Sequence, residues 1–452
     1  MNKLSTAGAL VALVSLSARA DDGAGPAPRK VTFEDAIAIA LKEAPAVAVG
    51  TEDVGKVEQE ARRDRAYRLP MLSVHDDLHE FTTEYDIPFQ LDPSMPPALF
   101  KAYSAFTNTV SVSLSEPITG QLYLNELLAA HELDNDAAHR RLDSVRLDAA
   151  SRAAEAYVHV LAARAAADVA HKTVAQLEAQ LERAQKLRAA DTYNDIDVLR
   201  FKSAKAAADR AALRADANVD SVLATLVVVI GLRDGDPIDV VDDLPTQMPP
   251  LAITVAQAQD RALASRSDVL ESHDRVKASD HYRRAAYAGY VPDVRAEAVF
   301  LHNTGYYPFQ PDNAGFLGVT LQWNVWDWGV TASKVAQAKH EDAAVKILDA
   351  DLENNVRLDV RKRWLEAKAA FDGLAAADTQ LQATEESYRL QQVRFQASAA
   401  TTTDVLDAET DVARARLAAA DARYDYLLAL IAMSRAVGDL PATTAVGAPS
   451  GH

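Results

Sequence analysis

The feature that most constrains this chain is the length of its helical patterns. One of them fills residues 121–188, and as a single helix it would span on the order of 100 Å. No compact globule needs a helix of that length. Another pattern, in the second half, carries large side chains every seven residues, at Leu374, Leu381, Tyr388 and Phe395. Because a seven-residue period keeps one side of a helix against a partner helix, we expect an extended, tubular assembly of paired helices.

Composition supports a mainly α fold and excludes several classes of partner. The chain is 49% hydrophobic, but only 6% aromatic, so its buried surfaces should be narrow and rich in alanine. The formal charge of −18 argues against a nucleic-acid partner, because phosphate binding depends on clustered Lys and Arg. The chain has no cysteine, which excludes disulfides, thiolate metal sites and a lipid anchor on Cys.

The sequence also contains an internal duplication. The stretch VTFEDAIAIAL, from Val31, is similar to ITVAQAQDRAL, from Ile253, and Pro70 matches Pro292 at the same offset of 222. Later matches, at an offset of 207, pair Asp197 with Asp404 and Gly231 with Gly438. Since the matches keep one order along the chain, we predict two copies of one structural plan.

Each copy is predicted to contain the same series of elements. A helical stretch (33–68 and 253–288) is followed by a strand, a loop rich in Pro, Asp and aromatic residues, and a second strand. A very long helix comes next, and a final helix ends at a glycine, where a left-handed cap is expected. The predicted segments are a signal peptide (1–20), a first repeat (21–231), a Pro/Asp-rich linker (232–250), a second repeat (251–440) and a loose tail (441–452).

The N-terminus is interpreted as a secretory signal because an apolar run precedes Ala18-Arg19-Ala20, a small-x-small cleavage pattern. A buried N-terminal helix is the alternative. No other segment is apolar over the length of a membrane-spanning helix, so we expect any membrane contact to be made by strands.

Two short segments, 110–118 and 317–325, alternate apolar residues with small or polar ones. A half-buried strand of a soluble sheet would alternate in the same way. Three observations favour a membrane strand instead: a signal precedes it, its length suits a tilted crossing of a bilayer, and its polar face carries Ser, Thr and Gln. In addition, Trp323, Trp326 and Trp328 cluster at one end of the second segment, as an interfacial aromatic belt would.

The number of strands predicts an assembly. Two strands per copy give about four per chain, whereas the smallest membrane barrels need about eight. An open sheet edge is not tolerated in lipid. The barrel must therefore be shared between several copies of the chain.

With these features together, the sequence resembles the TolC family of outer-membrane efflux channels over about 31–440. The resemblance rests on VTFEDAIAIALKEAPAV, the proline before the first strand, the glycine before the long helix and the block at 401–440. It implies a homotrimer with a twelve-stranded barrel in outer-membrane lipid and a long α-helical coiled-coil tunnel extending into the periplasm. A periplasmic adaptor protein and an inner-membrane transporter are the implied partners.

The resemblance also assigns candidate residues. Acidic side chains near the periplasmic tip form a constriction in the family, and the matching acids here are Asp404, Asp407 and, in the first copy, Asp197. Asp404 could equally cap the N-terminus of the final helix. The family often has glycine in the turn at the tip, where this chain has Ser398 and Ala400, with Asp191 in the comparable place of the first copy.

An enzyme is not expected, because the chain contains no Gly-x-Ser-x-Gly, Gly-rich phosphate loop or His-Glu-x-x-His. No cofactor is expected either. His75 and His79 share one strand face beside acids and are weak metal candidates, which are explained more simply as residues of a hydrophilic lumen or loop.

The function implied by the resemblance is a passive exit duct of a tripartite efflux system, which exports drugs, toxic compounds or metal ions. One alternative is the protein export duct of a type I secretion system. Another is a soluble periplasmic coiled-coil scaffold or adaptor, which would leave the strands and tryptophans without a purpose.

Overall fold

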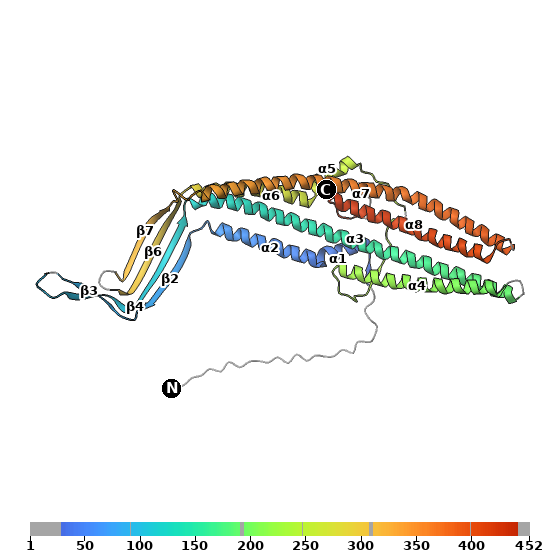
Figure 1. Ribbon diagram of the computed structural model, residues 1–452, viewed down its shortest axis with the longest axis horizontal. Helices are drawn as coiled ribbons and strands as arrows, with labels where there is room; N and C mark the ends of the chain where they lie inside the picture. Colours follow the sequence, from blue (N-terminus) through green and yellow to red (C-terminus); the bar gives the residue numbers. More distant parts are fainter. Residues whose placement is uncertain are drawn as a thin grey trace, which may run out of the picture.

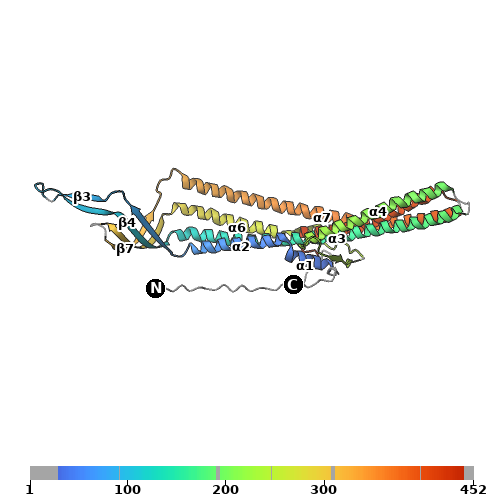
Figure 2. The same ribbon diagram turned by 90° about the horizontal axis from the view of Figure 1, so that it is seen from below.

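The computed structural model describes residues 29–90, 92–189, 194–245, 247–306, 311–397 and 399–441. The predicted signal peptide and nearly all of the predicted tail lie outside these ranges. The molecule is elongated, with a β-sheet at one end and two helical hairpins at the other (Figures 1 and 2). Within the described ranges, no helix combines the length and apolar character that a bilayer crossing requires.

The helices follow the predicted duplication. The first repeat contains α1 (Phe33–Glu43), α2 (Pro45–Ala66), α3 (Gly120–Ala189) and α4 (Asp195–Val229); the second contains α5 (Val255–Ser265), α6 (Ser267–Tyr287), the short 3₁₀ helix η1 (Ala288–Tyr290), α7 (Val330–Gln396) and α8 (Thr402–Val437). The long helices α3 and α7 begin and end within a few residues of the predicted positions. The seven-residue pattern also holds, because Tyr388 and Phe395 are buried in the hairpin that α7 forms with α8.

The helical stretches predicted as 33–68 and 253–288 are each broken once. In the first, Pro45 opens α2 and its predecessor Ala44 is extended (φ −62°, ψ 128°), as a residue before proline prefers to be. In the second, Arg266 has the same geometry (φ −64°, ψ 126°) without a following proline. Its half-buried guanidinium instead pairs with Asp268 and Asp359 and donates to the Ala436 carbonyl. Tertiary contacts therefore fix the second break.

Local chemistry sets the other helix ends. Thr32 and Thr254 begin α1 and α5 with capping boxes, in which the side chains of the cap residue and the third helical residue bond each other's backbone N–H. Gly231 follows α4 with φ +88°, and a Cβ there would lie 2.4 Å from the Glu43 carbonyl oxygen, so only glycine fits. Gly438 ends α8 in the same left-handed region, as predicted.

The main sheet contains β2 (Met71–Glu80), β3 (Tyr85–Phe89), β4 (Ala98–Pro117), β6 (Asp293–Tyr306) and β7 (Asn313–Gln322). Its order is β2-β4-β6-β7, all antiparallel, while β3 pairs with the outer part of β4. β3 lies in a segment predicted as loop. β4 is much longer than the predicted 110–118, and β7 ends three residues before the predicted 325, because the chain there turns toward α7.

A second, smaller sheet lies partly within 232–250, the segment predicted as a Pro/Asp-rich linker. Within it, β5 (Ile238–Val240) pairs in parallel with β1 (Arg29–Val31). The pairing joins the beginning of the first repeat to the segment that leads into the second.

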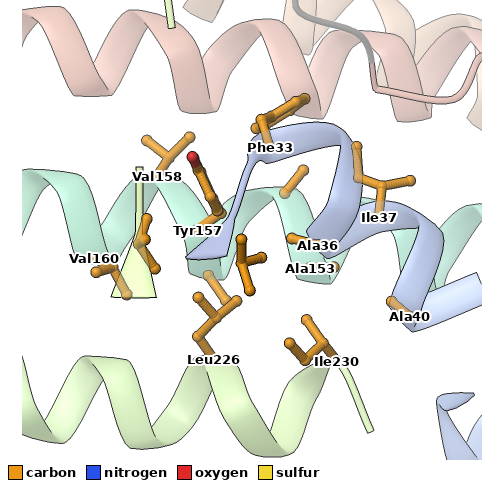
Figure 3. Close-up of a cluster of buried hydrophobic side chains, with 14 of the residues drawn as sticks. Phe33, Ala36, Ile37, Ala40, Ala153, Tyr157, Val158, Val160, Leu226 and Ile230 are labelled. Carbon is orange, nitrogen blue, oxygen red and sulfur yellow. The ribbon is translucent and has the colours of Figure 1, made fainter. Parts of the chain in front are cut away.

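The largest hydrophobic core lies in the middle of the molecule, where α1, α3, α4 and β5 meet (Figure 3). The ring of Phe33 packs edge-on against Tyr157 at 5.6 Å between centroids. Tyr157 is fully buried and its hydroxyl donates to Asp243 Oδ1 at 2.9 Å. Alanines fill much of the remaining space, as the composition predicts, and let the long helices approach closely.

Candidate functional site: the sheet and the helical tip

The register of the main sheet separates its side chains into two faces. Leu72 pairs with Leu114, Leu114 with Ala298, and Ala298 with Leu317, so these four residues share one face. We call it the apolar face; its other apolar members are Val74, Leu78, Val110, Val112, Val294, Ala296, Phe300, Val319 and Leu321. Farther from the helices, the same face also carries polar residues: Asp76, Asn108, His302 and Asn313.

The apolar face is most exposed on its two outer strands, β2 and β7. Leu317 is 87% exposed, and Leu72 and Val319 are each 67% exposed. In the part of the sheet nearest the helices, apolar side chains therefore lie next to one another across four strands, and an exposed apolar surface of this kind marks contact with another protein or with lipid. The expected alternation of apolar and polar residues is therefore confirmed, and it extends across all four strands.

The opposite face is mainly hydrophilic, and we call it the polar face. Ser73 and Ser113 lie 2.7 Å apart through their hydroxyls, and Thr320 donates to Glu297 Oε1 at 2.8 Å. A chain of hydroxyl, amide and carboxylate groups of this kind suits a surface in contact with water.

His75 and His79 both lie on the polar face of β2, as the sequence predicts. His75 Nε2 lies 3.1 Å from Asp77 Oδ1, and the ring of His79 stacks on Phe81 with centroids 6.0 Å apart. Among the described residues, neither histidine belongs to a group of three metal-binding side chains with neighbouring ligand atoms.

The three tryptophans lie just beyond β7, at the boundary between sheet and helices. Trp323, Trp326 and Trp328 are 54%, 75% and 88% exposed, and the rings of the last two pack edge-to-face at 5.7 Å. The turn that presents them is held by Asp327, whose carboxylate accepts from the backbone N–H of Gly329 (3.0 Å) and Thr331 (2.7 Å).

The sheet has two open sides. In the described part of the chain, β2 and β7 each pair with a single neighbour and leave their outer edges without a partner strand. Exposed edges of long strands ordinarily invite pairing with another chain.

At the far end of the molecule, the α3–α4 and α7–α8 hairpins are joined by a small core, the tip cluster. Its buried members are Ala184, Phe201, Tyr388, Phe395, Val405 and Val412. Phe201 of α4 and Phe395 of α7 pack at 6.4 Å between ring centroids. This contact fixes the two hairpins side by side.

The three candidate acids all lie near the tip, but they have different surroundings. Asp404 completes a capping box with Thr401 at the start of α8, and its Oδ2 accepts from the Thr401 backbone at 2.7 Å. These hydrogen bonds from Thr401 hold the pKa of the Asp404 carboxyl below its usual value. The structure therefore confirms the capping role of Asp404.

Asp197 contacts the other hairpin. Its Oδ1 accepts from the buried Thr402 hydroxyl at 2.7 Å, and one turn later Arg200 Nη1 donates to Thr403 Oγ1 at 3.1 Å. Asp407 is exposed, and its side chain forms no hydrogen bond or ion pair with the described residues. Ser398 and Asp191, at the turns, lie outside the described ranges.

Comparison with known proteins shows which protein family the chain resembles. Residues 258–439 match the family model of outer membrane efflux proteins. The matched residues make up most of the second repeat, from α5 to the end of α8, and they are similar to the outer membrane efflux proteins. The resemblance inferred from the sequence is thereby confirmed, and the chain is a protein of the outer membrane that extends into the periplasm.

Individual members of this family resemble the chain over most of its length. The outer membrane efflux protein BepC of Brucella suis biovar 1 (strain 1330) is 24% identical over 351 residues, which are 74% of this chain and 73% of BepC. The outer membrane protein VceC of Vibrio cholerae has a TM-score of 0.74 at 16% identity, over 90% of this chain and 96% of VceC. The CmeC outer membrane channel of Campylobacter jejuni has a TM-score of 0.74 at 13% identity, over 90% of this chain and 85% of CmeC.

Sequence reasoning missed one more feature of the tip. Glu409 of α8 is only 3% exposed, beside Tyr388, and burial raises the pKa of its carboxyl. Neither of its oxygens hydrogen bonds to another described residue. Glu409 follows Leu406 by three residues in the sequence. Which acid of α8 is buried, however, depends on how α8 lies against α7 and α3, and no local sequence pattern reveals that.

Proposed function

We propose that this protein is a passive exit duct of a tripartite efflux system, in which three copies combine their strands into one outer-membrane barrel. The observation that carries the proposal is the two-faced sheet with both edges open. Three copies of the four-stranded path β2-β4-β6-β7 would give twelve strands, within the range of membrane barrels.

The two faces support this arrangement. Closed into a barrel, the apolar face would contact lipid and the polar face would line a water-filled lumen, which then contains His75 and His79. The exposed tryptophans would lie at the level of the lipid headgroups, as an aromatic belt. A soluble scaffold would instead have to keep the apolar face in water.

The helical part would continue the barrel as a tunnel toward the inner membrane. Its tip would contact a periplasmic adaptor, and the adaptor would connect it to an inner-membrane transporter that supplies the energy. The cargo would be small molecules such as drugs, toxic compounds or metal ions, in agreement with the efflux role in the family name.

We further propose that Asp404, Asp407 and Asp197 form the constriction at the tip. Threefold symmetry would bring several carboxylates together and favour cations in the opening. The hydrogen bonds of Asp197 and Arg200 to the start of α8 would hold the two hairpins of each copy together in the closed state.

Conductance in planar bilayers tests the constriction. The double variant Asp404→Ala/Asp407→Ala should raise the closed-state conductance. Asp411→Ala, one turn further along α8, removes an exposed acid that pairs with Arg414 and should change nothing. Equal closed-state conductance in the wild type and the double variant would contradict the proposed gate.

A further inference from the structure

Away from the sheet and the tip, three metal-binding side chains converge where α6 lies beside α7 (Figure 1). His273 is on α6, and Asp349 and Glu353 are one turn apart on α7. His273 Nε2 lies 3.3 Å from Glu353 Oε1 and 3.8 Å from Asp349 Oδ1. All three ligand atoms lie within 4.8 Å of one another.

The charges at this place distinguish it from the nearby ion pairs. Neighbouring acids of the same two helices each have a basic partner: Glu271 with Arg275 at 2.6 Å, and Asp342 with Lys346 at 2.8 Å. Within the described residues, neither Asp349 nor Glu353 pairs with a Lys or Arg side chain. Two carboxylates at a spacing of four residues on one helix repel each other. With a neutral imidazole, the group therefore carries a charge of about −2 without a balancing cation.

We propose that His273, Asp349 and Glu353 bind one divalent transition-metal ion, which ties α6 to α7. An imidazole nitrogen with two carboxylate oxygens suits Zn²⁺ and its neighbours, whereas Ca²⁺ and Mg²⁺ prefer oxygen ligands alone. Tetrahedral Zn²⁺ at about 2.0–2.2 Å from each ligand keeps ligand atoms roughly 3.4 Å apart. The observed separations of 3.3 and 3.8 Å are close to this value.

The surroundings fit a metal site that is open on one side. The side chains of His273 and Glu353 are each 38% exposed and that of Asp349 is 20% exposed, so an ion can enter and water can complete its coordination. The Ser272 hydroxyl donates to Asp349 Oδ1 at 2.6 Å and orients this carboxylate, as outer-sphere partners of metal ligands do.

The competing explanation is that a protonated His273 forms salt bridges with the two acids and no metal binds. The two explanations differ in a measurable way, because an imidazolium has no free lone pair for a metal. The proposal does not depend on the transport function, since it concerns a link between two helices of one chain.

Titration of the purified full-length protein, free of any affinity tag, with Zn²⁺ tests the site. Calorimetry should show one Zn²⁺ per chain at micromolar or lower concentration, and Mg²⁺ or Ca²⁺ should not compete. His273→Gln should weaken binding at least tenfold. The matched control His281→Gln lies on the same helix, and among the described residues His281 pairs with Glu126 alone; this variant should bind as the wild type does.

Two outcomes overturn the proposal: no saturable binding up to about 100 µM Zn²⁺, or binding of equal strength in the His273→Gln variant. The double variant Asp349→Asn/Glu353→Gln provides a second test, since it should lose binding although its side chains keep their size. Should either variant fail to fold, Co²⁺ added to the wild type decides, because the visible absorption bands of a tetrahedral site support the proposal and their absence overturns it.

Discussion

The sheet and the helical body of this protein differ in where their apolar side chains lie. In the helices, Ala150, Ala153 and Ala154 are completely buried, although single large apolar side chains such as Ile347 and Leu348 are exposed. In the sheet, Leu317 and Leu72 are 87% and 67% exposed. The helices thus bury an apolar core, whereas the sheet leaves the side chains of its apolar face largely exposed. The difference indicates that two parts of one chain are built for two solvents.

The largest effect is expected in the helical core. Leu226→Ala removes a completely buried side chain of α4 and should lower the free energy of unfolding by about 2–5 kcal/mol. Leu213→Ala, on the same helix but 70% exposed, should cost less than about 0.5 kcal/mol. Urea titrations followed by the helical circular dichroism signal measure both. Similar losses in the two variants would show that α4 does not bury the side the structure assigns to the core.

The second largest loss of stability is expected in the sheet. Leu317→Arg places a charge on the apolar face and should destabilise the protein in vesicles by about 2–4 kcal/mol. Thr320→Arg, three residues along β7, places the same charge on the polar face and should be tolerated. Folding into lipid vesicles, followed by protease resistance of the inserted sheet, compares them. Equal tolerance of both arginines would remove the distinction between the two faces.

A pH effect is expected at Glu409, in the helical body. The pKa of Glu409 is raised in the folded chain, so its contribution to stability is complete below the unfolded pKa of about 4.3 and is lost as the pH rises through the folded value. Glu409→Gln should therefore be more stable than the wild type at pH 8, with a smaller difference at pH 4. The exposed Glu178→Gln is the control. A Gln variant that is less stable at pH 8 would contradict the assignment.

The smallest effect is expected at the tip. Thr401→Ala removes the capping box of α8 and should cost about 1 kcal/mol locally. Asn194→Ala, at the start of α4, should change little, because the Asn194 side chain makes no capping hydrogen bond. Hydrogen exchange at the two helix starts measures both, and insertion of the sheet into vesicles should not change in either variant. Faster exchange at α4 than at α8 would reverse the expected order.

The parts of the fold that could be predicted are those with a long local period. The helices α3 and α7, the seam at Tyr388 and Phe395 and the alternation in β7 all follow from patterns within one segment. The short strands β3 and β5 could not be predicted, since so few residues carry no usable period. The break at Arg266 was missed because its cause is a set of side-chain contacts with α7 and α8.

The features of the candidate sites also divide into those that a local sequence pattern predicts and those that it does not. The polar face, with His75 and His79, and the exposed tryptophans could be predicted from alternation and composition. The bond between Asp197 and Thr402, the burial of Glu409 and the group around His273 depend on how helices lie against one another. Asp197 and Thr402 are 205 positions apart, and His273 and Asp349 are 76 positions apart. A single sequence does not reveal how such distant residues are aligned against one another.

The central claim is that neighbouring copies pair β2 of one with β7 of the next. Because the natural chain has no cysteine, Val74→Cys in β2 can be combined with single cysteines at Leu317, Val319 or Leu321 of β7, and the membrane-inserted protein oxidised. We predict that at least one combination gives a covalent trimer on non-reducing electrophoresis, with no larger species and no trimer from the single-cysteine variants. Monomers alone from every combination, or ladders that continue past three copies, would contradict the shared barrel.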